Sequence, residues 1–332
     1  MEEIDKDDAF DVPPELEDII EHLLVSLRDR DTVVRWSAAK GVGRITMRLP
    51  RDMADDVVGA VLDQFDDPDN DLAWHGSCLA LAELARRGLL LPSRLDVVVP
   101  LIRKAIHFDV LRGQHSIGQH VRDAASYVCW AFARAYSPEI MKPYIEDLSA
   151  AMLLAALFDR EINCRRAASA AFQENVGRQG NVNFPLGIEI ITIADYFSLG
   201  NRSQAYCIIA PKIASMDAAV HKSAVIHLHE SKLCHWDREI RELSSRCLAN
   251  MVPLGPKVCL EVLAALVPEG CSPNLYKRHG AVLGLSTMLL AYKLFEEILP
   301  SSLIECLQIF TEIIQNITQN LLIHIGTGEK SS

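Results

Sequence analysis

The sequence predicts an all-α protein, a HEAT/armadillo-type α-solenoid of about seven helix-pair repeats arranged as a right-handed stack. Three observations support this fold class. First, 49% of the residues are hydrophobic and 6% are aromatic, and Ala and Leu dominate, which suits helices packed closely on helices. Second, apolar side chains recur at helical spacing, as in Val34, Ala38, Val42 and Ile45. Third, a short signature around an Arg recurs along the chain.

The signature is an Asp or Asn, a short gap, an aliphatic residue, an Arg and then small residues that begin an apolar helix. Its clear copies lie at Arg35, Arg122, Arg166, Arg241 and Arg278, and weaker copies lie at His75 and Arg202. These seven positions are 40, 47, 44, 36, 39 and 37 residues apart, close to the HEAT and armadillo period of roughly 40 to 47 residues. In such a fold each repeat contacts only its neighbours, so a long curved face is the expected functional surface.

A partner helix is expected before each signature helix, so that the two form an antiparallel pair. The clearest partner helices are expected over residues 16–27, 54–65, 95–108, 143–158 and 258–267. Pro68, Pro92, Pro138 and Pro273 stand in the loops, where they end helices. Residues 173–185 are more polar than repeat packing requires, and we expect them to form a long loop.

The signature has a structural explanation. An Asp at a helix N-terminus caps free backbone amides, and the Arg one turn later is placed to reach the Asp of a neighbouring repeat. We therefore expect the repeated Arg to be structural. Trp36, Trp74, Trp130 and Trp236 lie near the small residues that follow it, and we expect packing between repeats rather than a ligand cage.

The formal net charge of −11 is concentrated at the N-terminus. Residues 1–14 are expected to be an acidic, disordered leader, residues 15–325 the solenoid, and residues 326–332 a flexible tail. The acidic balance argues against a nucleic-acid partner, which requires a basic stripe. The nine cysteines include no CxxC pair and are interpreted as buried, reduced thiols. No signal peptide and no apolar run of membrane-spanning length is found, so we expect a cytoplasmic protein without a membrane span.

No motif in the sequence indicates catalysis. The chain has no P-loop, and the Lys40-Gly41-Val42-Gly43 segment lies in a helical repeat rather than after a strand. It has no nucleophile elbow of the GxSxG type. A histidine- and cysteine-containing cluster matches no closed zinc pattern; it comprises His227, His229, Cys234 and His235. The sequence therefore predicts a protein-binding molecule that is not an enzyme and holds no cofactor or metal.

The most polar region of the chain is the best candidate for a partner-binding site. It combines amides and arginines with aromatic residues, the composition of an interface centre. The candidate residues are Arg165, Arg166, Asn175, Arg178, Gln179, Tyr196, Phe197, Asn201 and Arg202. The alternative is an ordered loop whose polar groups satisfy its own backbone, and the sequence leaves both interpretations open.

Three segments resemble the tubulin-folding cofactor D family, also called tubulin-specific chaperone D. They are INCRRAASAAFQENVGRQG at 162–180, ADYFSLGNRS at 194–203 and VRDAASYVCWAFARAY at 121–136. Further matching blocks are DTVVRWSAAKGVGRIT, WHGSCLALAELARRGLLLPSRL, HWDREIRELSSRCL and RHGAVLG. The resemblance extends from about residue 12 to residue 290, and its blocks are more specific than general HEAT similarity.

The resemblance implies a chaperone that acts after the cytosolic chaperonin and binds β-tubulin. With tubulin-folding cofactors E and C, it would assemble and disassemble the αβ-tubulin heterodimer. The resemblance also implies GTPase-activating action on tubulin within the multi-cofactor complex, regulation by an Arf-like small GTPase, and a cytoplasmic location associated with the microtubule cytoskeleton. Family members are several times longer, so this chain corresponds to a central section or a truncated form. A general HEAT-repeat adaptor or scaffold remains the alternative.

Stimulated GTP hydrolysis raises the question whether Arg165 or Arg166 acts as an arginine finger. Both lie on the repeat signature, where one Arg is expected for structural reasons. We therefore favour a structural role for this pair.

Overall fold

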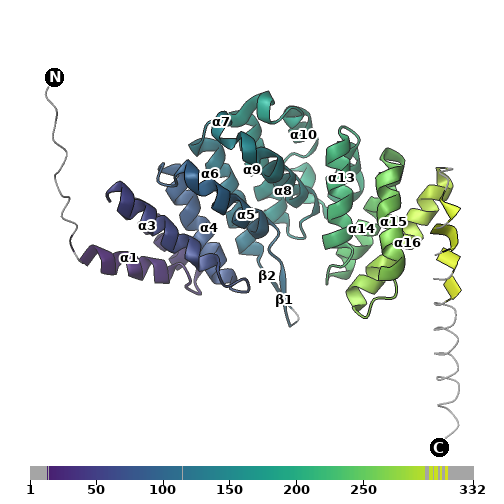
Figure 1. Ribbon diagram of the computed structural model, residues 1–332, viewed down its shortest axis with the longest axis horizontal. Helices are drawn as coiled ribbons and strands as arrows, with labels where there is room; N and C mark the ends of the chain where they lie inside the picture. Colours follow the sequence, from purple (N-terminus) through teal and green to yellow (C-terminus); the bar gives the residue numbers. More distant parts are fainter. Residues whose placement is uncertain are drawn as a thin grey trace, which may run out of the picture. The chain divides into compact units, whose positions relative to one another are not determined.

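The computed structural model describes residue 13 and residues 15–113, 115–295, 299–301, 303–305, 307–308 and 311–312. The predicted tail, and all of the predicted leader except Pro13, lie outside the described residues. The chain divides into two compact units, Met1–Gly200 and Asn201–Ser332, which we call unit 1 and unit 2. Helices dominate both units (Figure 1), which confirms the all-α solenoid class. No helix in the described part of the chain is both long and apolar enough to cross a membrane.

Unit 1 contains four complete helix pairs. They are α1 (Glu15–Ser26) with α2 (Thr32–Thr46), α3 (Arg51–Leu62) with α4 (Asp71–Arg86), α5 (Leu95–Ile106) with α6 (Gln119–Ala135), and α8 (Ile145–Phe158) with α9 (Ile162–Asn183). Short elements join them: η1 (Asp63–Phe65), η2 (Pro92–Arg94), α7 (Pro138–Met141), η3 (Lys142–Tyr144), α10 (Gly187–Ile193) and η4 (Ser198–Gly200). The predicted preceding helices at 16–27, 54–65, 95–108 and 143–158 are confirmed, with ends shifted by a few residues.

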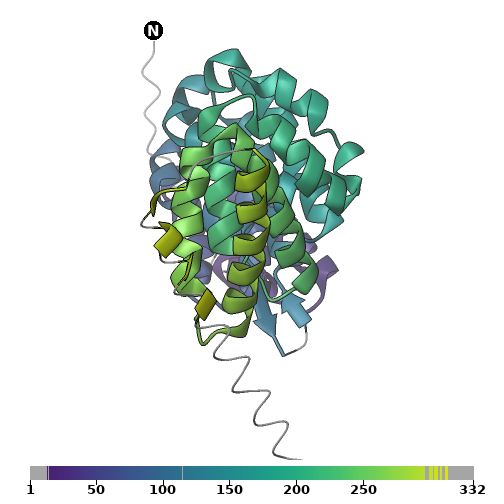
Figure 2. The ribbon, with the colours of Figure 1, turned by 90° about the vertical axis from the view of Figure 1, so that its right-hand side faces the viewer.

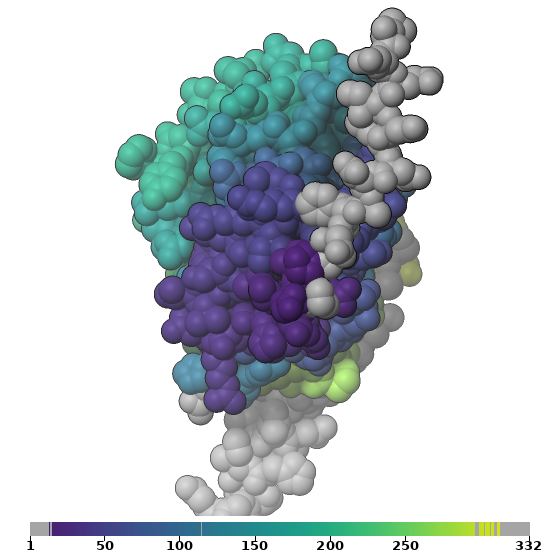
Figure 3. All heavy atoms as spheres, turned by 90° about the vertical axis from the view of Figure 1, so that its left-hand side faces the viewer, coloured from purple at the N-terminus to yellow at the C-terminus, as the bar shows by residue number. Residues whose placement is uncertain are grey.

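The second helix of each pair belongs to one continuous layer. Helices α2, α4, α6 and α9 pack side by side in that order, and each first helix packs on the second helix of its own pair. Residues 73–85 of α4 are all buried, because α4 has α2 on one side and α6 on the other. At the start of the chain, by contrast, α1 has no buried residue, and an open groove beside it is lined by Leu24, Val25, Ala60 and Gln64. Figure 3 views unit 1 from this side, with α1 in dark purple.

Unit 2 begins with a continuous helical stretch and continues with two helix pairs. The stretch comprises α11 (Arg202–Gln204), η5 (Ala205–Ile209) and α12 (Ala210–Ala214). The pairs are α13 (Ala218–His227) with α14 (Arg238–Met251) and α15 (Pro256–Glu269) with α16 (Leu275–Leu294); η6 (Leu228–Lys232) and η7 (Val252–Leu254) extend α13 and α14. All seven signature positions lie in the helices α2, α4, α6, α9, α11, α14 and α16, so the repeat count is confirmed.

The η5 segment is a π-helical turn with an identifiable cause. Pro211 has no backbone N–H, so the carbonyl of Cys207 loses the donor that a regular α-helix would supply. The side-chain amide of Asn250 in α14 donates to this carbonyl instead, at 3.1 Å. The carbonyl of Cys207, which Pro211 leaves without its helical donor, thus receives a hydrogen bond from a neighbouring repeat.

One local expectation is wrong. Residues 173–179 are not a loop, because α9 continues through them until Gly180, whose φ of 68° breaks the helix. A β-hairpin, which was not predicted, lies between α5 and α6. Its strands, β1 (Val110–Arg112) and β2 (His115–Ile117), pair antiparallel with Val110 opposite Ile117. The hairpin projects from the helices of unit 1 (Figures 1 and 2).

Candidate protein-binding surface

The repeated arginines hold the loop that precedes their own helix. Nη1 of Arg35 donates to the carbonyls six and five residues earlier, at 2.6 and 3.0 Å. Arg165 repeats this arrangement at 3.0 and 3.1 Å, and Arg241 repeats it at 2.6 and 2.9 Å. The ladder position in the fourth pair is therefore Arg165, which is 2% exposed, and not the predicted Arg166.

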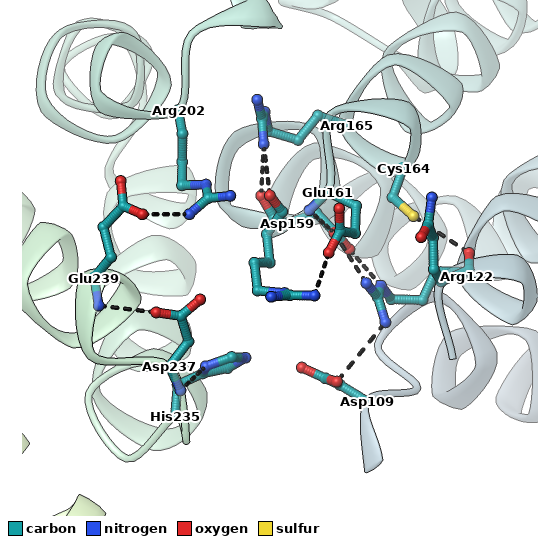
Figure 4. A network of polar contacts seen from close by, with 12 residues as sticks. Asp109, Arg122, Asp159, Glu161, Cys164, Arg165, Arg202, His235, Asp237 and Glu239 are labelled. Atoms are coloured by element: carbon teal, nitrogen blue, oxygen red, sulfur yellow. Dashed lines mark hydrogen bonds and ion pairs between the residues drawn. The ribbon is translucent and has the colours of Figure 1, made fainter. Parts of the chain in front are cut away.

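The Nε atom of a repeated arginine also makes a contact beyond its own loop, at Arg35, Arg122, Arg165 and Arg241. Arg122 donates to Oδ2 of Asp159 at 2.6 Å, as predicted for the signature (Figure 4). Arg35 instead donates to Nδ1 of His75 at 2.7 Å, and Arg165 donates to the carbonyl of Leu199 at 2.9 Å. The expectation of an Asp therefore holds at Arg122, whereas a His replaces the Asp at Arg35 and Arg241 and a backbone carbonyl replaces it at Arg165.

Three of the predicted partner-binding residues are buried. Arg165 donates four hydrogen bonds to backbone carbonyls, including that of Gly200. Asn175 is 2% exposed and donates to the carbonyls of Cys129 and Ala171, at 3.1 and 2.9 Å. Gln179 is also 2% exposed. A partner could reach these side chains only if the repeats separated, so their hydrogen bonds join α9 to its neighbours.

Arg166, Tyr196 and Phe197 form a corner of unit 1, which we call the aromatic corner; both aromatic residues are exposed, and Arg166 is half-buried. The Arg166 guanidinium lies 4.4 Å from the centre of the Tyr196 ring, and the Tyr196 and Phe197 rings meet edge to face at 5.5 Å. The Asp195 carboxylate accepts hydrogen bonds from the backbone N–H groups of Phe197 and Ser198, both at 2.7 Å. These bonds hold the turn in place, although Phe197 is 82% exposed.

The remaining predicted residues make local contacts. Nε of Arg178 donates to Glu174 at 3.1 Å on the exposed side of α9. Asn201 caps α11 by accepting from the backbone N–H of Gln204. Arg202 forms an ion pair with Glu239 at 2.8 Å. Asn201 and Arg202 belong to unit 2, whereas the aromatic corner belongs to unit 1.

The sequence analysis missed a row of aromatic rings that covers α4. Trp36 of α2 and Tyr127 of α6 meet at 5.6 Å between ring centres, and Tyr127 stacks on Trp130 at 5.7 Å. Tyr127 donates through its hydroxyl to Glu83 of α4 at 3.1 Å. The first and third pairs therefore touch across the second. Trp74, in contrast, is buried between repeats as the packing interpretation expects.

Cations lie over these rings. Lys40 is 5.5 Å from the centre of Trp36, while Arg86 and Arg134 are 5.6 and 4.6 Å from the centre of Trp130. These three cations with Trp36, Tyr127 and Trp130 form what we call the aromatic–cation strip. A sequence signal for it does exist, because Trp36 and Lys40, like Trp130 and Arg134, are four residues apart on one helix face.

A buried carboxylate anchors this strip from below. Glu83 is 2% exposed and accepts from Arg86, Arg87 and Tyr127. Burial raises its pKa, but the hydrogen bonds from Arg87 and Tyr127 outweigh burial and hold the pKa below its usual range. Glu83 therefore stays ionised and fixes the positions of the cations and the tyrosine above it.

The expectation of buried thiols holds for five of the eight described cysteines, Cys78, Cys129, Cys164, Cys247 and Cys259, whereas Cys207 and Cys234 are half-buried and Cys271 is exposed. Burial raises the pKa of Cys129 and of Cys259 to about 12. Burial also raises the pKa of Cys78 and Cys247. A protonated thiol is a poor nucleophile and a poor metal ligand. Within the described residues, no group of three or more His, Cys, Asp or Glu side chains is placed to hold a metal ion.

Comparisons with known proteins give a consistent result. Residues 1–188 match the family described as tubulin-specific chaperone D-like, ARM repeats. Tubulin-specific chaperone D of Dictyostelium discoideum is 47% identical over 279 residues, which cover 82% of this chain and 18% of that relative. Tubulin-folding cofactor D of Schizosaccharomyces pombe is 34% identical over 288 residues, which cover 82% of this chain and 26% of that relative.

An engineered protein of known crystal structure is 15% identical to this chain, and the match covers 82% of this chain and 70% of the engineered one. Its TM-score of 0.36 is too low to define a shared fold. The chain spans about a fifth to a quarter of the length of its two curated relatives. The family match covers more than half of the chain. This chain therefore belongs to the tubulin-specific chaperone D-like family of ARM-repeat proteins.

Proposed function

We propose that this chain is a section of a tubulin-folding chaperone that binds β-tubulin and takes part in assembly and disassembly of the αβ-tubulin heterodimer. Membership of the family is the observation that carries this proposal, because the two curated relatives are named tubulin-specific chaperone D and tubulin-folding cofactor D. The chain would act by binding its client on an extended surface rather than in a deep pocket.

The aromatic corner is the proposed contact for the client. Phe197 and Tyr196 are 82% and 48% exposed, and the Asp195 carboxylate fixes their turn before any partner arrives. Rigid, exposed aromatic rings next to an Arg are typical of residues that dominate binding energy. Arg178, Asn201 and Arg202 are proposed as peripheral contacts, since each already has a partner within the chain.

The same proposal extends to the other partners of the family. Tubulin-folding cofactors E and C would join the complex, an Arf-like small GTPase would regulate it, and the protein would work in the cytoplasm beside the microtubule cytoskeleton. GTPase-activating action on tubulin would arise only in the multi-cofactor complex. A finger role for Arg165 would require breaking four backbone hydrogen bonds, so only Arg166 could supply such a residue without local unfolding.

A general HEAT-repeat adaptor is the second candidate function. It is favoured by the open groove beside α1, where Val25 is 65% exposed and Leu24 lines the wall. An adaptor would bind short linear peptides of many proteins, whereas a chaperone of this family would discriminate tubulin from other acidic proteins.

Capture of purified β-tubulin by the immobilised chain tests the proposal, with an unrelated HEAT protein of equal net charge as the control. Selective capture is expected. The Phe197→Ser variant should weaken capture about tenfold, which corresponds to about 1.4 kcal/mol. Val182→Ser is the matched control, because Val182 is 83% exposed in the same unit but lies outside the aromatic corner. Equal capture of tubulin by this chain and by the unrelated HEAT protein would contradict the proposal.

A further inference from the structure

Charge is segregated between the two helix layers of unit 1. The second helices α2, α4, α6 and α9 carry nine Lys and Arg residues against four Asp and Glu. The first helices α1, α3, α5 and α8 carry three Lys and Arg against ten Asp and Glu. Three of the nine, Arg35, Arg122 and Arg165, are buried and hold neighbouring repeats together. The other six are not buried, so a chain with a net charge of −11 carries accessible cations on this layer. These favour an acidic partner on the second-helix layer.

Four of the accessible cations of this layer lie in or next to the aromatic–cation strip. Each of the four second helices supplies at least one of them: Lys40 on α2, Arg86 on α4, Arg134 on α6 and Arg178 on α9. The side chains of Arg86, Arg134 and Arg178 are 42%, 42% and 53% exposed. Three of these cations lie over the rings of Trp36 and Trp130.

The chain itself shows how a carboxylate binds here. Oε1 of Glu174 accepts from Nη1 of Arg134 at 3.2 Å and from Nε of Arg178 at 3.1 Å. This one carboxylate therefore bridges α6 and α9 at the end of the strip. Each guanidinium has five N–H donors in a planar fork, so both arginines retain donors for a second carboxylate.

We propose that the aromatic–cation strip, continued by Arg178, binds an extended segment of a protein partner that is rich in Asp and Glu. The spacing of the cations sets the pattern of that segment. Packed helices lie about 8–10 Å apart. A chain in the extended polyproline II conformation advances about 3.1 Å per residue and, with three residues per turn, places every third side chain on the same face. One acidic side chain at about every third position would therefore meet one cation on each successive helix, over about ten residues. The inference rests on the proposed function, because it states the chemistry of a client segment.

A single-stranded nucleic acid is the competing polyanion, since it also uses cations and aromatic rings. Its bases need open ring faces on which to stack. Here Lys40 lies over Trp36, and Arg86 and Arg134 lie over Trp130, while Tyr127 stacks on Trp130. Carboxylates can bind these cations without displacing them, so an acidic peptide fits the arrangement better.

The test uses the full chain and a fluorescein-labelled ten-residue peptide with Glu at every third position and Gly or Ser elsewhere. We expect saturable binding by fluorescence anisotropy that weakens as salt is raised. The peptide with Gln in place of Glu should bind at least tenfold more weakly. The triple variant Lys40→Gln, Arg134→Gln, Arg178→Gln should lose at least tenfold in affinity for the Glu peptide.

The matched control removes the same charge from exposed positions associated with the first-helix layer. Arg51→Gln, Lys104→Gln and Lys142→Gln together should leave peptide affinity unchanged within about twofold. Circular dichroism and the thermal midpoint must show that both triple variants fold. Equal loss in the two variants, or equal binding of the Gln and Glu peptides, would overturn the proposal.

Two further readouts separate the competing outcomes. Tighter binding of oligo-uridine than of the Glu peptide, lost in the strip variant, would assign the surface to nucleic acid instead. Tubulin capture without Glu-peptide binding would leave the proposed function standing and defeat this inference. Glu-peptide binding at the strip without tubulin capture would support the strip and contradict the tubulin function.

Discussion

The two units contain the same junction between neighbouring repeats, built from an Arg and a His. In unit 1, Nε of Arg35 donates to Nδ1 of His75 at 2.7 Å. In unit 2, Nε of Arg241 donates to Nδ1 of His279 at 3.0 Å. Because an Arg is always protonated, each histidine must accept this bond as a neutral ring that carries its proton on Nε2.

A glycine follows each of these histidines and allows the helices to meet. A Cβ atom on Gly76 would lie 1.9 Å from the carbonyl oxygen of Leu27, and one on Gly280 would lie 1.7 Å from that of Leu233. Each leucine stands eight residues before the junction Arg of its own unit. The Arg, the His-Gly dipeptide and the Leu therefore form one module that is used twice.

The two copies differ in burial. His75 is 4% exposed, and its ring lies 5.6 Å from that of His120, whereas His279 is half-buried. Burial, followed by the charge of Arg35, lowers the pKa of His75 to about 3. Burial and Arg241 also lower the pKa of His279. The same hydrogen bonds are thus found around both histidines, but the free energy needed to protonate the histidine differs. It is larger for His75, because the surrounding helices cover His75 more completely than His279.

The largest expected effect comes from the glycines. Gly76→Ala and Gly280→Ala should each destabilise their unit by about 3 kcal/mol, because the new methyl group meets a backbone carbonyl that cannot rotate away. Urea unfolding followed by circular dichroism measures this loss. Gly59→Ala is the matched control in α3, since no atom lies within 4 Å of its Cβ position, and it should stabilise by about 0.5–1 kcal/mol. If Gly76→Ala unfolded at the wild-type urea concentration, the close approach in unit 1 would be wrong.

The next effect concerns the arginines. Arg35→Lys and Arg241→Lys should each cost about 2–3 kcal/mol, because one ammonium cannot replace both the Nη1 bonds to the loop and the Nε bond to the histidine. Arg165→Lys should behave in the same way, with the thermal midpoint as the measurement. Arg166→Lys is the matched control and should change stability by less than about 0.5 kcal/mol, since Arg166 is only half-buried, and an ammonium can replace its hydrogen bond to the carbonyl of Tyr196 and its position over the Tyr196 ring.

Arg165 and Arg166 also show what the sequence could not predict. The repeat could be predicted because the helical spacing of apolar residues is visible in the sequence, and the period located all seven helices that carry a signature position. It could not choose between Arg165 and Arg166, which are adjacent and chemically identical. The position of the α9 axis relative to its neighbours buries Arg165, whereas it leaves Arg166 half-buried.

The candidate surfaces were predictable only in part. Tyr196 and Phe197 could be identified because an aromatic pair in a polar segment is conspicuous in any sequence. The aromatic–cation strip could not, because Trp36 and Tyr127 meet only once α4 has been placed between their helices. The β1–β2 hairpin could not be predicted for another reason. Its strands are three residues each, too short to show alternation, and only Gly113 at a φ of 62° marks the turn.

The smallest effect is the difference in acid sensitivity between the two junctions. The folded-state pKa of His75, about 3, is below the value of about 6.5 in an unfolded chain, so below pH 6.5 the unfolded state binds more protons. Stability is therefore lost as the pH falls from about 6.5 towards 3. One buried histidine of this kind costs about 2 kcal/mol at pH 5.

His75→Gln keeps an acceptor for Arg35 but cannot be protonated, so it should flatten the dependence of the unfolding free energy on pH between 7 and 5. His279→Gln should flatten it less, because solvent reaches the ring and lowers the cost of its charge. Urea titrations at pH 7, 6 and 5 measure both slopes. If the slope of unfolding free energy against pH is equal in the two variants, the Arg that is present in both junctions determines the pKa of the histidine, and burial does not. If only His75→Gln removes the loss of unfolding free energy between pH 7 and 5, burial of His75 between α2, α4 and α6 causes the difference between the two junctions.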